Sequence, residues 1–100
     1  MDEYSVILSP CAQSDFFDVA EHMDNLLPEI AAQSFETFVR TVASLEKSPN
    51  NYPLAKDSQL RLRGYRLLPI DKYVVFYVIN GNVVEIRRIL YARRQYERLF

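Results

Sequence analysis

The C-terminal end of the sequence concentrates side chains that could bind anions or move protons. Its last thirteen residues, RILYARRQYERLF, contain four arginines and two tyrosines: Arg88, Arg93, Arg94, Arg98, Tyr91 and Tyr96. A guanidinium group binds carboxylate or phosphate through paired hydrogen bonds, and a tyrosine hydroxyl can act as a general acid or base. Because Arg and Tyr are also frequent anchors of protein interfaces, the segment indicates contact with either a polyanion or a protein.

The positive charge of this segment contrasts with the rest of the chain. Residues 1–50 carry nine acidic and two basic residues, a net charge of −7, whereas residues 51–100 carry four acidic and ten basic residues, a net charge of +6. The two halves sum to the overall charge of −1. Two readings remain open: the basic half attracts an acidic partner, or the two halves attract each other within the fold.

Composition excludes several kinds of site. One hundred residues, 49% of them apolar, predict a single domain spanning residues 1–100 with a substantial core. A lone cysteine, Cys11, predicts no internal disulfide, and the absence of a Cys/His cluster predicts no metal site. Gly64 and Gly81 are the only glycines, so no glycine-rich loop suits a phosphate-bearing cofactor, and we expect no cofactor. His22, the only histidine, is expected at the surface and not in catalysis.

Two further absences concern location. The longest apolar runs fall far short of the roughly 20 residues that span a bilayer, so no membrane association is expected. The N-terminal residues MDEYSV are acidic and lack the features of a signal peptide. Together with the single cysteine, these features predict a cytoplasmic protein.

Hydrophobic periodicity predicts the order of elements. Residues 4–8 form a β-branched and aromatic run typical of a strand, and Ser9-Pro10 is a typical helix start. Apolar steps of three and four residues then predict two helices that form a hairpin. Alternation with a period of two, followed by a strongly apolar run and its return, predicts three strands. The expected elements are a strand at 4–8, helices at 10–25 and 28–47, a loop at 48–53, and strands at 60–68, 72–79 and 82–90.

The Asn80-Gly81 pair favours a two-residue turn between the last two strands. Such a turn places Ile79 opposite Asn82 and Tyr73 opposite Arg88 on one face of the hairpin. The opposite face then pairs Phe76 with Glu85, and Val74 with Arg87. Both faces are largely apolar, so one should pack against the helices, and the other is too apolar to be left simply in water.

These elements and motifs together resemble the RelE/ParE superfamily of bacterial type II toxins, over nearly the whole chain. The resemblance is carried by YSVILSPCAQSD, SLEKSPNNYP, RGYRLLPIDKYVVFYVING and VEIRRILYARRQYERLF. It implies an α+β fold with the order β-α-α-β-β-β, in which the helical hairpin packs on a small antiparallel sheet. It also implies a growth-inhibiting toxin that a cognate antitoxin neutralises, in a toxin–antitoxin hetero-oligomer.

The superfamily includes two activities, and the residues favour one of them. RelE-like members cleave mRNA on the ribosome with basic residues and a tyrosine, and the matching residues here are Arg66, Arg93, Arg94 and Tyr96. Leu68 and Val74 occupy positions where further cations would stand, and the chain is acidic overall. The resemblance therefore favours a ParE-like toxin that binds a protein target such as DNA gyrase. The alternatives are a ribosome-dependent mRNA endoribonuclease, or an inactive toxin fold that serves as a binding module.

A ParE-like reading needs a surface for the antitoxin or the target. We expect an apolar groove on the sheet, flanked by arginines that would meet acidic residues of the bound segment. The expected binding residues are Val74, Phe76, Val78, Arg87, Arg93, Arg94 and Arg98.

Overall fold

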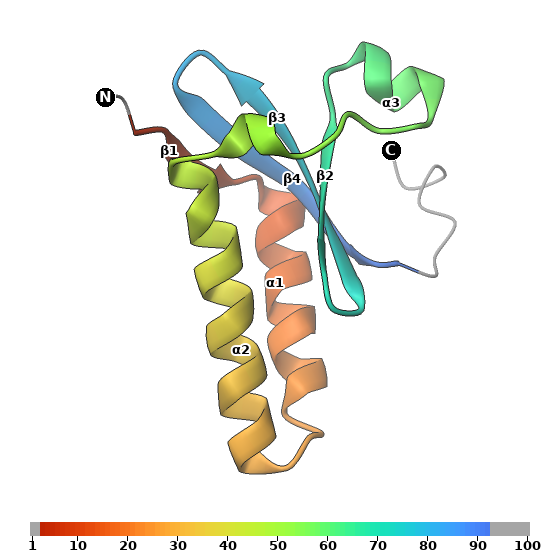
Figure 1. The fold of residues 1–100 in the computed structure, drawn as a ribbon. Helices are drawn as coiled ribbons and strands as arrows, with labels where there is room; N and C mark the ends of the chain where they lie inside the picture. Colours follow the sequence, from red (N-terminus) through yellow and green to blue (C-terminus); the bar gives the residue numbers. More distant parts are fainter. Residues whose placement is uncertain (1–2, 93–100) are drawn as a thin grey trace.

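The computed structural model describes residues 3–92 and shows a helical hairpin lying on one face of a four-stranded sheet (Figure 1). The elements are β1 (Ser5–Leu8), α1 (Pro10–Met23), α2 (Pro28–Ala43), two short 3₁₀ helices (Ser44–Glu46 and Pro49–Asn51), α3 (Ser58–Leu62), β2 (Arg66–Ile70), β3 (Tyr73–Asn80) and β4 (Val83–Tyr91). The predicted α+β class and the helical hairpin are confirmed. Ser9 caps α1 as predicted, since its side chain accepts a hydrogen bond from the Ala12 N–H at 3.2 Å.

The last three strands are antiparallel as predicted, and the N-terminal strand joins them in parallel, which makes the whole sheet mixed. Its strand order is β1-β4-β3-β2, and β1 lies at one edge, parallel to β4. The other two pairs of strands are antiparallel. A parallel pair needs a long crossover connection, and all the elements between β1 and β4 supply it.

The strand predicted at residues 60–68 is partly wrong, because its first residues form α3. The Asp57 carboxylate accepts hydrogen bonds from the backbone N–H groups of Gln59 at 3.0 Å and Leu60 at 3.1 Å, which starts a helical turn. Leu60 is 3% exposed and Leu62 is 87% exposed. Residues two apart would share a face of a strand, so the alternation of Leu and Arg was misread, and β2 begins only at Arg66.

The predicted register of the β3–β4 hairpin is also wrong. The turn consists of Gly81 and Asn82, with Asn80 paired to Val83, and Gly81 has a φ of +63°. Only the first of the two turn residues has positive φ, the pattern of a type II′ turn, in which Gly is favoured at that position. Ile79 therefore pairs with Val84.

An irregularity shifts the register again farther along the hairpin. Tyr77 pairs with Ile86, but Phe76 pairs with Arg88, so Arg87 is an extra residue in β4, as in a β-bulge. Beyond the bulge, Val74 pairs with Leu90 and not with Arg87. Ile89 consequently belongs to the core beneath the helices, where a continuous ladder would have placed Arg88.

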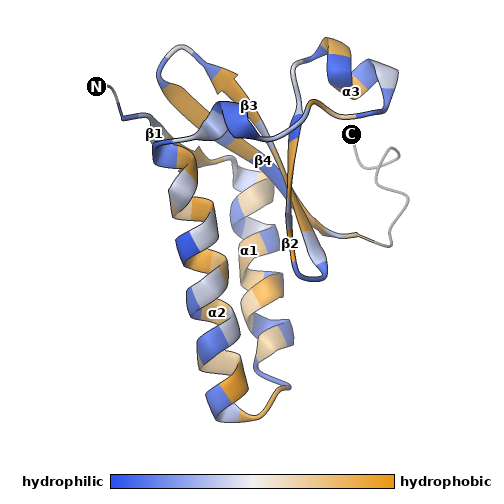
Figure 2. Cartoon of the chain, in the orientation of Figure 1, coloured by the Kyte–Doolittle hydropathy of each residue, from blue (hydrophilic) through white to orange (hydrophobic). Residues whose placement is uncertain are grey.

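Most residues of β3 and β4 are apolar (Figure 2). Each face of these strands has its own core. The larger core lies between the sheet and the helices; its fully buried members include Phe38, Leu45, Leu68, Tyr77 and Ile86. The smaller core lies on the opposite face and contains Ala55, Leu60, Tyr65, Phe76 and Leu90. Residues 53–65, with α3 among them, therefore supply the cover that the second face requires.

The sheet anchors the loop that follows α2 at two points. The buried Tyr77 hydroxyl donates a hydrogen bond to the Pro49 carbonyl at 2.5 Å, and the Arg66 guanidinium donates to the Tyr52 carbonyl at 2.6 Å. Burial raises the pKa of Tyr77 to about 12, although the nearby Arg66 opposes this rise. The protonated hydroxyl is thus part of what fixes the start of the covering segment.

We expect Tyr77→Phe to lower the free energy of unfolding by about 1 kcal/mol, because a buried hydrogen bond is lost while the ring is kept. Thermal denaturation should show a fall in melting temperature of roughly 4–8 °C. Tyr4→Phe is the matched control, since the Tyr4 hydroxyl only accepts a long hydrogen bond, 3.4 Å, from Asn50. An equal loss in the two variants would contradict the anchoring role of Tyr77.

The same group predicts a pH dependence. The unfolded chain loses the tyrosine proton near pH 10, whereas folded Tyr77 keeps it until about pH 12. The stability that Tyr77 contributes is therefore complete below pH 10 and is lost as the pH rises toward 12. Tyr73, whose pKa burial also raises to about 12, adds to this decline. Tyr77→Phe should make the decline shallower in denaturation measured between pH 9 and 12, and an unchanged slope would contradict the assignment.

Candidate protein-binding surface

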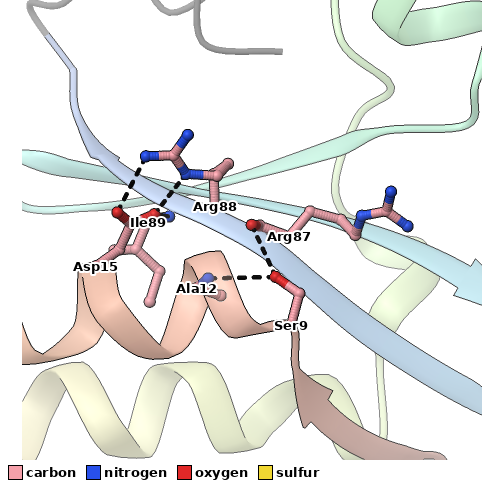
Figure 3. Close-up of polar contacts among 6 residues, drawn as sticks. All are labelled: Ser9, Ala12, Asp15, Arg87, Arg88 and Ile89. Carbon is pink, nitrogen blue, oxygen red and sulfur yellow. Dashed lines mark hydrogen bonds and ion pairs between the residues drawn. The ribbon is translucent and has the colours of Figure 1, made fainter.

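The N-terminal part of α1 completes the edge of β4 where β1 ends. β1 pairs with β4 only as far as Ile86. Ser9 then donates its N–H to the Ile86 carbonyl at 2.9 Å and its hydroxyl to the Arg87 carbonyl at 3.0 Å (Figure 3). Farther along α1, an Asp15 oxygen accepts the Ile89 N–H at 2.9 Å. The helix thus satisfies backbone groups that a longer β1 would have paired.

Asp15 also holds the side chain of Arg88. The Arg88 Nε lies 2.7 Å from Asp15 Oδ2 and its Nη2 lies 3.1 Å from Oδ1, which makes the contact bidentate (Figure 3). Asp15 is 7% exposed and is the one charged residue that is buried among residues 3–92. The hydrogen bond to Asp15 raises the pKa of Arg88. Arg88 was predicted near Tyr73, but the bulge directs it to α1.

The bulge residue Arg87 is exposed and points away from the Asp15 contact (Figure 3). Its guanidinium lies 2.8 Å from Glu85 and 5.8 Å from the centre of the Tyr65 ring. The hydrogen bond to Glu85 is the main cause that raises the pKa of Arg87, although partial burial opposes it. Arg87 is therefore a fixed positive charge held over an aromatic ring at the surface.

Around Arg87 the surface forms a cavity of about 480 Å³, which we name the arginine pocket. It is lined by Ser9, Pro10, Cys11, Arg63, Tyr65, Glu85, Arg87 and Arg88. Three arginines and one glutamate line the pocket, although Arg88 is paired with Asp15 and Arg87 with Glu85. The excess of arginine suits an additional carboxylate from a partner. Arg63 and Tyr65 were not among the predicted site residues; the basic pattern of RLRGYR was the available signal, but it was assigned to a strand.

The structure corrects the predicted apolar groove. Phe76 is 0% exposed, because Ala55, Leu60 and Tyr65 of the covering segment pack against it. The predicted groove is therefore closed at Phe76, and the binding role predicted for this residue stays a prediction. Val74 and Val78 are half-buried at the margin of the same cluster. Val78 pairs with Glu85, which places it beside the arginine pocket.

The expectation that Leu68 occupies the position of a cation in the site is wrong as well. Leu68 is 1% exposed and belongs to the core beneath the helices, so it does not occupy a cationic position on the opposite face. Arg66 pairs with Tyr77 and bonds the Tyr52 carbonyl, which gives it a structural role. The predicted site residues Arg93, Arg94, Tyr96 and Arg98 lie outside the described residues.

Two further findings concern metal binding and membrane spans. No group of three or more His, Cys, Asp or Glu residues within 3–92 is arranged to hold a metal ion. In the same part of the chain, every helix is too short or too polar to span a membrane.

Comparison with known proteins places the chain in a family. Residues 6–96 match the model of the ParE toxin of the type II toxin–antitoxin system parDE, so the chain belongs to the ParE toxin family. No curated protein sequence matches it. The fold is similar to a chain of the chromosomal ParDE toxin–antitoxin system from P. aeruginosa, with 20% identity, a TM-score of 0.71, and coverage of 89% of this chain and 96% of that one.

A second similar structure comes from the toxin–antitoxin complex RelBE2 of Mycobacterium tuberculosis. It shares 22% identity with a TM-score of 0.60, and the match covers 94% of this chain and 97% of that one. The RelE/ParE superfamily fold is thus confirmed, and the protein is a type II toxin of the ParE kind.

We expect Asp15→Ala to lower the free energy of unfolding by about 2–3 kcal/mol, because it leaves the Ile89 N–H and the Arg88 guanidinium without their carboxylate. Chemical denaturation measures the loss. Asp18→Ala, on the same helix but exposed, should change stability by less than about 0.5 kcal/mol. A double-mutant cycle with Arg88→Ala should give a coupling energy of about 1–2 kcal/mol; additive effects would contradict the pairing.

Proposed function

We propose that this ParE-family toxin acts by binding a protein target, DNA gyrase, and that a cognate antitoxin, which neutralises it in the cytoplasm, binds at the arginine pocket. The family match supports a ParE-like toxin, and the gyrase target follows from the resemblance to ParE-like members. The observation that carries the binding mode is the clustering of Arg63, Arg87 and Arg88 around one cavity. Of the four residues considered for RNA cleavage, Arg66 alone falls within residues 3–92, and its guanidinium bonds a backbone carbonyl.

The antitoxin segment that fits this surface is acidic and partly apolar. Its carboxylates would meet Arg63 and Arg87, which are exposed, while Arg88 stays with Asp15. Its apolar side chains would contact Val78 and Val74, which lie at the margin of the smaller core. Phe76 then supports these valines from below. Arg93, Arg94 and Arg98 remain proposed contacts on the basis of their charge.

Arg87→Glu should weaken antitoxin binding by about tenfold or more, because a positive charge is replaced by one that repels acidic residues. Isothermal titration calorimetry with the purified antitoxin measures the change. Arg40→Glu is the matched control, because it makes the same charge reversal on the exposed face of α2. Equal weakening by both variants would indicate a general charge effect and contradict a role for the pocket.

The target is tested by activity assays on the purified protein. We expect inhibition of DNA supercoiling by gyrase, and relief of that inhibition by the antitoxin. Cuts in translated mRNA without an effect on supercoiling would contradict the proposal in favour of a RelE-like endoribonuclease. No effect in either assay and no growth arrest on expression would instead identify an inactive binding module.

A further inference from the structure

The free end of the helical hairpin is apolar although it lies beyond the sheet (Figure 1). In the link between α1 and α2, Leu26 is 43% and Leu27 is 66% exposed, and Ile30 in the first turn of α2 is 48% exposed. Figure 2 shows hydrophobic colour at this end of the hairpin. We name Leu26, Leu27 and Ile30 the hairpin tip. Within residues 3–92, no other segment buries these three side chains, and each remains at least 43% exposed.

Two residues of the link between the helices depart from local helix preferences, although Pro28 at the first position of α2 and Glu29 in its first turn follow them. Leu27 is the N-cap residue of α2 and makes no side-chain capping bond, whereas Ser, Thr, Asp or Asn is favoured there. Asp24 is the C-cap residue of α1, at the negative end of the helix dipole, where a base is favoured. Residues that break local rules without a structural gain are typical of functional sites.

Negative charge surrounds the hairpin tip. Glu21, Asp24 and Glu29 are exposed, and none of them forms a salt bridge with another residue of the range 3–92. Asp24 also lines a cleft of about 550 Å³ between the end of α1 and the ends of β3 and β4. Asp18, Glu21 and Tyr91 line the same cleft, so a partner's basic side chain could enter it. This charge repels nucleic acid and selects a basic protein surface.

We propose that the hairpin tip is the surface that docks the toxin's protein target, through a patch of apolar residues flanked by lysine or arginine. This inference rests on the proposed function, because the partner is the target that the toxin inhibits. The acidic surroundings of the hairpin tip would then favour a basic partner, and the basic arginine pocket would favour an acidic one. The target and the antitoxin accordingly contact different surfaces of the same toxin.

The test combines Leu27→Ser with Ile30→Ser in the full chain. Serine at position 27 supplies a capping oxygen to α2, so the variant should fold with an unchanged or higher melting temperature. On induction in bacteria, growth arrest should be relieved, with about tenfold or more surviving colonies relative to the wild type. Antitoxin affinity, measured by calorimetry, should stay within about threefold. Leu62→Ser on α3, which also removes an exposed leucine, should behave as the wild type.

Each other result overturns a stated part of the inference. Growth arrest equal to that of the wild type would show that the hairpin tip does not dock the target. An equal loss of antitoxin affinity would show one shared surface in place of two. A dimer of the wild type that the variant dissociates, seen by sedimentation, would make the hairpin tip a contact between copies. If the wild type arrests no growth, the proposed toxin activity fails, and target docking at the hairpin tip fails with it.

A charge-based variant provides an independent check. Glu21→Gln, Asp24→Asn and Glu29→Gln together keep the apolar side chains and remove three negative charges. We expect them to relieve growth arrest partially and to leave antitoxin affinity unchanged, because charge contributes mainly to association with a basic surface. Full growth arrest with these substitutions would contradict a basic partner.

Discussion

The carboxylate of Asp15 is the constraint on which the arrangement of helices and sheet depends. β4 has nine residues and β1 has four, so the outer edge of β4 continues beyond its neighbour. Asp15 accepts the Ile89 N–H on that edge and pairs with Arg88 at the same time. A single buried side chain thus fixes the distance and rotation of α1 against the sheet. Replacing it with an apolar residue would leave a polar backbone group without a partner.

The β-bulge at Arg87 also determines how α1 contacts the sheet. By adding one residue to β4, it changes which side chains face each side of the sheet beyond that point. Ile89 enters the core, Arg88 reaches Asp15, and Arg87 stays at the surface over Tyr65. The core of the helical face and the charge of the arginine pocket are therefore set by one irregularity.

Local signals in the sequence predicted the helices well, because helical periodicity and the Ser9-Pro10 start depend on neighbouring residues. The same reasoning failed for residues 60–62. Their alternation with a period of two predicted a strand, but the capping bonds of Asp57 start a helical turn there. It also failed for Phe76 and Leu68, because the burial of each side chain depends on segments distant in sequence. The bulge has no local signature in the sequence, and without it the partners of Arg87 and Arg88 could not be assigned.

The charge asymmetry of the sequence left two interpretations open, and the ion pairs of the fold help to distinguish them. Among the ion pairs within residues 3–92, only Asp15 with Arg88 joins the acidic half to the basic half. Glu36 with Arg40, and Glu85 with Arg87, each lie within one half. Attraction between the halves thus accounts for one pair, and the other charged residues of this range are exposed or half-buried. Exposed charge contributes little to stability but strongly affects association. The asymmetry therefore favours a basic partner for the acidic half and an acidic partner for the basic half.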